Sequence, residues 1–299
     1  MSDLGTSLTP LSGGHSGRTF LGDVGGERAV VRVYPPGDPR GATAPEVDAA
    51  VLRLVRGLLP VPEVVEVRRE QPHDLQPGLL VTEWLPGERA DLVVADLEAA
   101  GDADGLSRLG AETGRVAGML AGMPMLRPGP FVDSTLTLGE FPDGGLLECV
   151  EHRLTGWSEG ERARLGEVAA QAQDLLDTVD RASLVHSDLN PKNLLVDRDT
   201  SSVTAVLDWE FAHAGHPWTD VGNLLRFERH PAYVDAVLSA WTSLRGGTPE
   251  QLLEGARSAD LWALVDLAAR AGANPVADRA ETLLRAIGES GDVHAWPFG

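Results

Sequence analysis

The chain has 299 residues, of which 42% are hydrophobic, enough for one large domain or two ordinary ones. Its formal net charge of -20 makes nucleic acid an unfavourable partner, because binding phosphate backbones requires many Lys and Arg side chains. No apolar run is long enough to span a bilayer, and the start, "MSDLGTSLTPLSGG", has neither the basic nor the apolar segment of a signal peptide. The single cysteine, Cys149, cannot form an internal disulfide. We therefore expect a cytoplasmic protein that binds no membrane and has no obligate protein partner.

The negative charge is concentrated in the larger part of the chain. Residues 1–85 carry 8 basic and 11 acidic side chains, net -3, which leaves -17 for residues 86–299. This distribution favours a small cationic substrate, while a solvated acidic surface is the open alternative.

The first 85 residues have the pattern of a small sheet. "RAVVRVY" (28–34), "EVVEVRRE" (63–70) and "GLLVTEW" (78–84) are rich in β-branched and apolar residues and predict short strands. Gly-rich turns upstream separate two further predicted strands. The apolar spacing in "APEVDAAVLRLVRGL" (44–58) predicts a helix. Together these patterns predict a mostly antiparallel sheet with one helix.

The composition changes after "LPGE" (85–88). Residues 91–123 and 159–182 are rich in Ala and Leu with helical spacing, and the chain from Asp220 onward has the same character. Between them, "NLLV" and "TAVLDW" predict paired strands about the polar turn "DRDTSS". We therefore predict an α+β chain with a sheet-rich part, residues 1–85, and a mainly helical part, residues 86–299.

The stretch "LVHSDLNPKNLLVD" (184–197) places several polar side chains around a proline. Pro191 among Asn and Asp disfavours a helix interior and predicts a loop. In isolation such residues are typical of an ordinary hydrogen-bonded turn. The order His186, Asp188, Asn193, followed by Asp208 after the predicted hairpin, is however the order that protein kinases use. The spacing thus favours phosphoryl transfer over a plain turn.

The residue types suit that chemistry. An unprotonated carboxylate accepts a proton near neutral pH, as a base acting on a hydroxyl must. Magnesium prefers hard oxygen ligands, which the amide of Asn193 and the carboxylate of Asp208 supply.

The chain resembles the aminoglycoside phosphotransferases and their relatives, small-molecule kinases with a protein-kinase-like fold. The resemblance covers most of the chain and is strongest at "VHSDLNPKNLLVD" and "AVLDWEFAHAGHPWTDVGNLL", with a weaker match at "LPVPEVV". It implies two lobes: residues 1–85, a small antiparallel nucleotide-binding lobe, and residues 86–299, a mainly helical catalytic and substrate-binding lobe. It also implies Asp188 as catalytic base, Asn193 and Asp208 as ligands of Mg²⁺, and Asp220 as a buried anchor of the catalytic loop, with His186 structural.

The same resemblance assigns nucleotide-binding residues in the first lobe. "SGGHSG" (12–17) stands where the family's glycine-rich loop covers phosphates, and residues 81–87 stand where it binds adenine. Family kinases place a lysine on the third strand, paired with a helix glutamate; this chain has Arg32, with Asp48 as partner and Glu46 as a possible substitute. An arginine can still bind phosphate oxygens, because its charge is permanent and its guanidinium is forked; an ordinary surface pair is the alternative. The implied residues are Gly13, Gly14, Ser16, Arg32, Asp48, Thr82, Glu83 and Trp84.

Lys192 is the only lysine in the chain and lies four residues after Asp188. Some kinases have a basic residue there, facing the transferred phosphoryl group, so we assign Lys192 a catalytic role in stabilising developing charge. The alternative is a solvated side chain beside a turn.

The predicted function is phosphoryl transfer from ATP, with GTP as an open alternative, to a hydroxyl of a small cationic molecule. An aminoglycoside or cationic peptide antibiotic, inactivated by phosphorylation, is the first candidate; choline, fructosamine and homoserine-type kinases share the motifs. A non-catalytic pseudokinase is an alternative suggested by Arg32. A metal-dependent hydrolase is another, using His186, Asp188, Asp208, His213 and His216.

Overall fold

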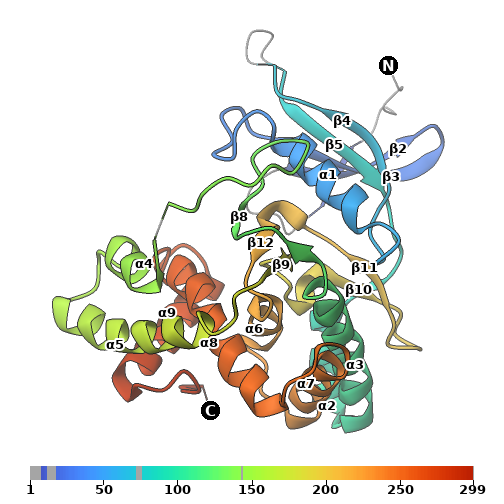
Figure 1. Cartoon of the computed structure of the whole chain (residues 1–299). Coiled ribbons are helices and arrows are strands. Elements are labelled where there is room, and N and C mark those ends of the chain that lie inside the picture. The colour runs from blue at the N-terminus through green and yellow to red at the C-terminus, as the bar shows by residue number, and fades with distance from the viewer. Residues whose placement is uncertain (1–7, 12–17, 72–75, 143, 299) are drawn as a thin grey trace. The chain divides into compact units, whose positions relative to one another are not determined.

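The computed structural model describes residues 8–11, 18–71, 76–142 and 144–298 (Figure 1). The chain forms two compact units. Unit 1 consists of Met1–Asp96, Pro130–Gly139 and Pro191–Ala212; unit 2 consists of Leu97–Gly129, Glu140–Asn190 and His213–Gly299. The predicted lobes are a nucleotide-binding part, residues 1–85, and a catalytic and substrate-binding part, residues 86–299. This division stays a prediction.

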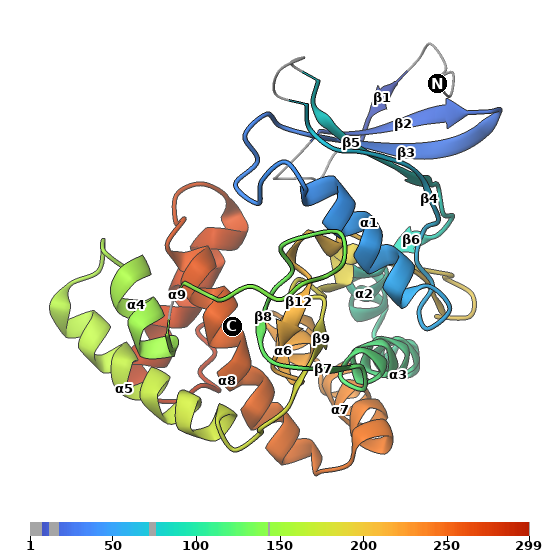
Figure 2. The same cartoon turned by 45° about the horizontal axis from the view of Figure 1, so that its top comes forward.

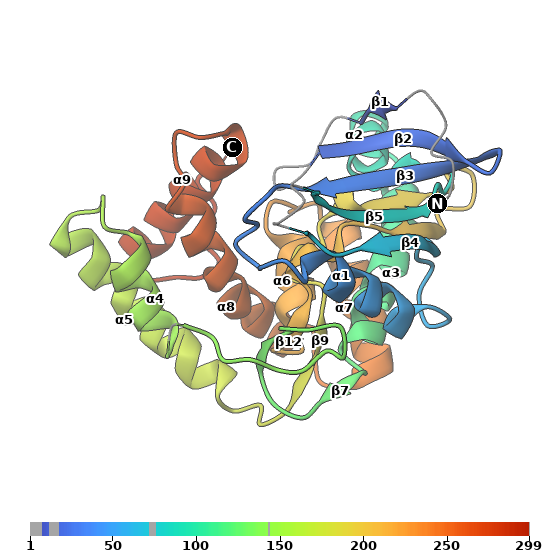
Figure 3. The same ribbon diagram turned by 90° about the horizontal axis from the view of Figure 1, so that it is seen from above.

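Unit 1 contains a five-stranded antiparallel sheet, in the order β1-β2-β3-β5-β4 (Figure 3). Its elements are β1 (Thr9–Pro10), β2 (Arg18–Val24), β3 (Glu27–Tyr34), α1 (Ala44–Val55), β4 (Val64–Arg68) and β5 (Gly78–Glu83). The predicted strands and helix are confirmed, whereas the glycine cluster at 12–17 lies outside the described residues. Alternating apolar side chains of β3 and β5 form the core of the sheet: Ala29, Val31, Leu79 and Val81.

Helix α1 has Pro45 in its first turn, a position that suits proline, and it packs against β4 and β5 (Figure 2). Its buried face includes Ala49, Leu52 and Val55, the spacing expected of an amphipathic helix. Asp48 is also buried on this helix. A buried carboxylate is unfavourable unless other groups bind it by hydrogen bonds or ion pairs, and the groups that bind Asp48 form part of the candidate site.

A second sheet of unit 1 holds the predicted hairpin. β10 (Leu194–Val196) pairs antiparallel with β11 (Val203–Val206), as predicted, and also with β6 (Glu88–Arg89). The short 3₁₀ helices η2 (Pro191–Asn193) and η3 (Trp209–Phe211) flank the hairpin. Pro191 therefore opens a short helix rather than lying in a plain loop, because its fixed φ suits a first helical position.

Unit 2 is mainly helical. Its elements are α3 (Ala103–Leu120), β7 (Pro124–Met125), α4 (Leu146–Arg153), α5 (Glu159–Leu176), β9 (Ala182–Val185), β12 (His213–Gly215), α6 (Thr219–Leu225), α7 (Pro231–Arg245), α8 (Pro249–Ala268) and α9 (Pro275–Ser290). Two elements run across the division between the units: α2 (Ala90–Ala100) and β8 (Gly129–Pro130). The helices expected beyond Asp220 are confirmed.

The main core of unit 2 lies among α4, α5, α8 and α9 (Figure 1). It contains Leu146, Leu165, Leu264, Leu284 and Cys149, all buried. β9 pairs antiparallel with both β12 and β7. Among the helices of the described residues, none is long and apolar enough to cross a membrane.

Candidate active site

The loop after β9 is held by a buried carboxylate. All four residues of β9 are buried in unit 2, and His186 directly follows this strand. The carboxylate of Asp220, in the first turn of α6 and 2% exposed, accepts bonds from the backbone N–H groups of His186 (3.0 and 3.1 Å) and Ser187 (2.9 Å). Burial raises the pKa of Asp220, and these backbone donors act in the opposite direction. The anchor predicted at Asp220 is confirmed.

His186 and Ser187 shape the turn that leads to Asp188. His186 is fully buried, and its Nδ1 lies 3.3 Å from the backbone N–H of Asp188, which donates to it. Ser187 has φ of 65°, a left-handed conformation that is uncommon outside glycine and is found at functional sites. These contacts support the structural role predicted for His186.

Asp188 is half-buried and is oriented by its neighbour Asn190. The side-chain amide of Asn190 donates to Asp188 Oδ1 (2.7 Å), and the Asn190 backbone N–H donates to the Asp188 carbonyl (2.8 Å). The Asn190 amide thus fixes the orientation of the Asp188 carboxylate, and the role of Asp188 as a base stays a prediction.

In unit 1, the β10–β11 hairpin brings the two predicted metal ligands to one end. Leu194 pairs with Val206, and the N–H of Leu207 donates to the carbonyl of Asn193 (2.9 Å). Asn193 immediately precedes β10, and Asp208 follows β11 with φ of 63°. The donors are an amide oxygen and a carboxylate, both hard ligands of the kind that Mg²⁺ prefers. The two side chains therefore fit the predicted ion.

Arg32 lies beside this end of the hairpin. Its guanidinium binds Asp208 Oδ1 (2.6 Å) and also forms an ion pair with Glu210. The side chains of Arg32 and Glu210 are 16% and 5% exposed, so little water screens the pair. Burial alone would lower the pKa of Arg32, but Asp208 and Glu210 hold it above its ordinary value. Arg32 is thus a permanent cation directed at the predicted metal ligand.

Asp48 is bound by residues that the sequence did not single out. The hydroxyl of Tyr34 donates to Asp48 Oδ2 (2.6 Å), and Arg40 donates to Asp48 Oδ1 (2.8 Å). The predicted partner of Asp48 was Arg32, yet both carboxylate oxygens are engaged by these other groups. The possible substitute, Glu46, binds Arg69 (2.6 Å) at the surface.

The remaining predicted nucleotide residues lie at the end of β5. Thr82 is buried, Glu83 donates its backbone N–H to Glu63 (2.9 Å), and Trp84 donates its own to Arg28 (3.4 Å). These N–H groups thus complete the sheet, and the adenine contacts of this segment stay a prediction. Gly13, Gly14 and Ser16 lie outside the described residues.

Lys192 lies in η2 and is half-buried. The functional residues that the sequence analysis did not single out are Tyr34, Arg40, Asn190 and Glu210. Glu210 follows Asp208 by two positions, which is a usable signal. Arg40 contacts Asp48, eight positions away, but its contact with the Glu210 carbonyl spans 170 positions and leaves no pattern in the sequence.

The histidines proposed for a metal-dependent hydrolase have other neighbours. His213 packs edge-on against Phe141, and the ring of His216 packs against Trp218, whose backbone N–H donates to His216 Nδ1 (3.3 Å). Within the part of the chain that the structure describes, no group of three or more His, Cys, Asp or Glu side chains is arranged to hold a metal ion.

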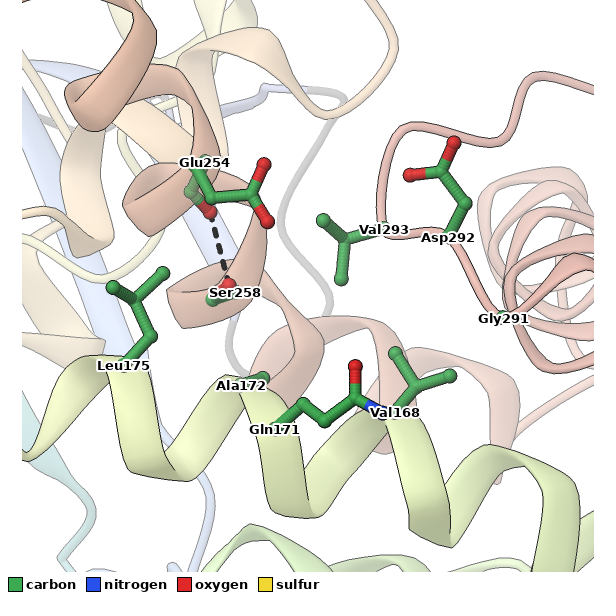
Figure 4. Close-up of a pocket in the computed structure, with 9 residues that line it drawn as sticks. All are labelled: Val168, Gln171, Ala172, Leu175, Glu254, Ser258, Gly291, Asp292 and Val293. Atoms are coloured by element: carbon green, nitrogen blue, oxygen red, sulfur yellow. Dashed lines mark hydrogen bonds between the residues drawn. The ribbon is translucent and has the colours of Figure 1, made fainter.

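Unit 2 also has a pocket of about 200 Å³ between α5, α8 and the segment after α9 (Figure 4). Val168 and Leu175 form its apolar side, and Glu254 and Asp292 its acidic side. None of the predicted site residues lines this pocket, so it carries no weight in assigning the reaction.

Comparisons with known proteins show the family and the fold of the chain. A model of the phosphotransferase enzyme family matches residues 7–254. No curated protein matches the chain.

Among solved structures, a thermostable mutant of aminoglycoside phosphotransferase APH(4)-Ia, in a ternary complex with ADP and hygromycin B, is 23% identical with a TM-score of 0.66, covering 96% of this chain and 94% of that one. The GDP complex of aminoglycoside 2'-phosphotransferase-IIIa is 19% identical with a TM-score of 0.66, covering 96% and 94%. A microcompartment-associated aminopropanol kinase is 21% identical with a TM-score of 0.61, covering 96% and 93%. These likenesses confirm the predicted two-lobed kinase-like fold.

Proposed function

The chain belongs to the phosphotransferase enzyme family, and on that premise we propose that it transfers the γ-phosphoryl group of ATP to a hydroxyl of a small cationic molecule. Membership makes the chain an enzyme of the small-molecule kinase type, as its sequence predicted. The donor, the acceptor and the residue roles are the proposed part. An aminoglycoside or cationic peptide antibiotic is the first candidate acceptor, and its phosphorylation would confer resistance.

One observation carries the proposal: the β10–β11 hairpin gathers Asn193 and Asp208 at one end, with Arg32 bound to Asp208. An amide oxygen and a carboxylate for a divalent ion, beside a guanidinium for phosphate oxygens, are the groups that suit a nucleoside triphosphate bound with its metal. Asn193 and Asp208 would hold Mg²⁺, which when bound neutralises negative charge on the phosphate oxygens. Arg32 would bind phosphate oxygens through its fork, and Lys192 would offset charge that develops during transfer.

Asp188 is the proposed base. It would accept a hydrogen bond from the acceptor hydroxyl, hold the oxygen in line for attack and take the proton as the new P–O bond forms, while the bond from the γ-phosphorus to the β–γ bridging oxygen breaks and ADP leaves. The Asp220 anchor and Asn190 keep this carboxylate in place, so little reorganisation is needed at the moment of transfer.

The acceptor is argued from charge. Residues 86–299 carry net -17, which attracts cations. Individual carboxylates contribute unequally, because Asp260 is already neutralised by Arg226 (2.7 Å) and Asp266 by Arg153 (2.9 Å). Hygromycin B in the complex of one structural neighbour supports an aminoglycoside acceptor. The aminopropanol kinase supports the alternative, a small amino alcohol.

The donor is ATP, with GTP as the competing choice. ADP and AMP-PNP in complexes of APH(4)-Ia support an adenine nucleotide, and the GDP complex of the 2'-phosphotransferase supports a guanine nucleotide. The backbone of residues 81–87 is the proposed contact for the base.

The test is a transfer assay. Purified protein is incubated with Mg²⁺, either ATP or GTP, and a panel of aminoglycosides, cationic peptide antibiotics and small amino alcohols, and mass spectrometry follows the addition of one phosphoryl group. The Asp188→Asn variant should lose roughly a hundred- to ten-thousand-fold in rate, the usual contribution of a positioned base. Asp199→Asn, an exposed aspartate in the hairpin turn, is the matched control and should behave as wild type.

A product formed by wild type and the control, and lost with Asp188→Asn, would support the proposal and name the acceptor class. Turnover that survives in Asp188→Asn would remove Asp188 from its role. Tight nucleotide binding without any product across the panel would favour the pseudokinase.

A further inference from the structure

Arg40 lies at the centre of a charged cluster in unit 1 that the proposed mechanism has not used. Its Nη1 donates to Asp48 Oδ1 (2.8 Å) and to the backbone carbonyl of Glu210 (3.1 Å). Its Nη2 lies 3.9 Å from Glu210 Oε2, and its Nε lies 3.4 Å from Asp38 Oδ1. One guanidinium thus joins helix α1 to the segment that directly follows Asp208.

The backbone around Arg40 holds it in this position. Asp38 accepts the N–H of Arg40 (2.9 Å), and its carbonyl accepts the N–H of Gly41 (2.8 Å). Three prolines, in "PPGDPRG" (35–41), restrict the same stretch. A side chain presented by a stiff turn loses little conformational entropy when it forms its contacts.

Two guanidiniums lie near the aromatic ring of Tyr34. Arg32 and Arg40 lie 5.4 and 5.6 Å from the centre of its ring, and its hydroxyl donates to Asp48. Contact with an aromatic face favours a guanidinium at each position. The ring therefore supports both arginines while its hydroxyl helps to hold the buried carboxylate of Asp48.

In this cluster two arginines share the roles that were predicted for one, Arg32. A single strand cation was expected to pair with the helix carboxylate and also to bind phosphates. Here Arg40 takes the helix carboxylate, while Arg32 binds Asp208 and Glu210. The side chain of Asp48 is 6% exposed, so losing Arg40 would leave a buried carboxylate that needs another cation.

We propose that Arg40 is a positioning residue for nucleotide binding: by neutralising Asp48 and holding the Glu210 backbone, it keeps Arg32 directed at Asp208 and the phosphates. This inference rests on the proposed function and adds a residue to it. Without Arg40, Asp48 draws Arg32 toward α1, away from the predicted metal ligand.

The experiment measures ATP affinity by isothermal titration calorimetry with Mg²⁺, which needs no knowledge of the acceptor. Arg40→Leu should weaken ATP binding by about tenfold or more, the effect of roughly 1.4 kcal/mol. Arg69→Leu is the matched control, because Arg69 also pairs with a carboxylate of α1, Glu46, but at the surface. It should bind ATP as wild type does.

A double variant separates positioning from general support of the fold. Adding Asp48→Asn to Arg40→Leu removes the charge that would attract Arg32, so ATP affinity should recover by several-fold over Arg40→Leu alone. A merely structural role predicts the opposite, since the double variant loses still more contacts. If Arg40→Leu does not fold, Arg40→Gln replaces it, because glutamine keeps a hydrogen-bonding side chain at this position but has no charge to neutralise Asp48.

The outcomes are distinct. Weakened binding that the second substitution restores supports the proposal. Wild-type affinity in the Arg40 variants, or a double variant weaker than Arg40→Leu, overturns it and leaves the proposed function intact. Wild-type protein that binds neither ATP nor GTP overturns the proposed function and this inference with it.

Discussion

At the scale of single residues, His216 links protonation to stability. The ring packs against Trp218 and accepts a hydrogen bond at Nδ1 from the Trp218 backbone. Burial, with Arg181 nearby, lowers the pKa of His216 from 6.5 to about 4. Protonation would place a charge in this partly buried site and remove the acceptor. His216 therefore binds a proton less readily in the folded protein than in the unfolded chain.

The sign of the pH dependence follows from this difference. Between pH 6.5 and about 4, the unfolded chain binds the His216 proton and the folded chain does not, so the free energy of unfolding falls as the pH is lowered through this window. At pH 5 the loss should be about 2 kcal/mol relative to pH 7. Urea denaturation at the two pH values measures it.

Two variants test the assignment. His216→Gln should lose less stability between pH 7 and pH 5 than wild type, whereas His152→Gln, at a histidine with a side chain 59% exposed, should retain the wild-type loss. Parallel curves for wild type and His216→Gln would show that other groups carry the pH dependence.

The site residues that could be predicted share a local signal. The spacing of His186, Asp188 and Asn193 lies within eight positions, and the anchoring role of Asp220 came with the family resemblance. Arg40 and Tyr34 were not predicted, because their contacts with Asp48, 8 and 14 positions away, follow no recognised motif, and the contact of Arg40 with Glu210 exists only in the fold. The carbonyl bound by Arg40 is 170 positions away, and composition contains no trace of that contact.

At the scale of elements, helices α3 and α7 approach each other closely through glycines. Gly110, Gly114 and Gly118 recur every four residues on one face of α3. An added Cβ at Gly110 would lie 2.5 Å from the carbonyl oxygen of Tyr233, and one at Gly114 would overlap the backbone of Val237. Beside them, the hydroxyls of Thr113 and Tyr233 are 3.0 Å apart.

Because of this close contact, replacing a glycine of α3 by alanine should destabilise the protein, although alanine is normally the better residue in a helix. Gly114→Ala should destabilise the protein by roughly 2–4 kcal/mol, because the two backbones must separate to admit one methyl group. Gly160→Ala is the matched control: that glycine lies in α5 with only the end of Arg164 near it, so alanine should be neutral or stabilise by up to about 1 kcal/mol. Urea midpoints of both variants decide the matter. Equal effects at the two sites would contradict close packing of α3 and α7.

The elements also show why some strands could not be predicted. β3 and β5 have eight and six residues with β-branched patterns, and their strands were predicted. β6, β7 and β12 have two or three residues each, and their pairing partners are distant in the sequence. A segment so short has no periodicity of its own, so its strand character depends on its partner.

At the scale of the whole molecule, the net charge of -20 opposes the binding of ATP, another anion. The charged cluster in unit 1 is also net negative. Asp38, Asp48, Asp208 and Glu210 contribute four negative charges against two positive charges from Arg32 and Arg40, a net of -2. A divalent cation would neutralise that difference, so ATP and Mg²⁺ should bind cooperatively.

Global stability reports this cooperation, because a ligand that binds only the folded state raises the free energy of unfolding. ATP with Mg²⁺ should stabilise wild type by about 2.7 kcal/mol at a hundred times the Kd, and ATP with EDTA by clearly less. In Asp208→Asn the increment due to Mg²⁺ should largely vanish, because the amide is a weaker ligand than the carboxylate. ATP without metal should bind this variant at least as well as wild type, since one negative charge is gone and Arg32 loses a competing partner. Asp199→Asn should keep the full increment, and a Mg²⁺ increment that persists in Asp208→Asn would place the metal on other ligands.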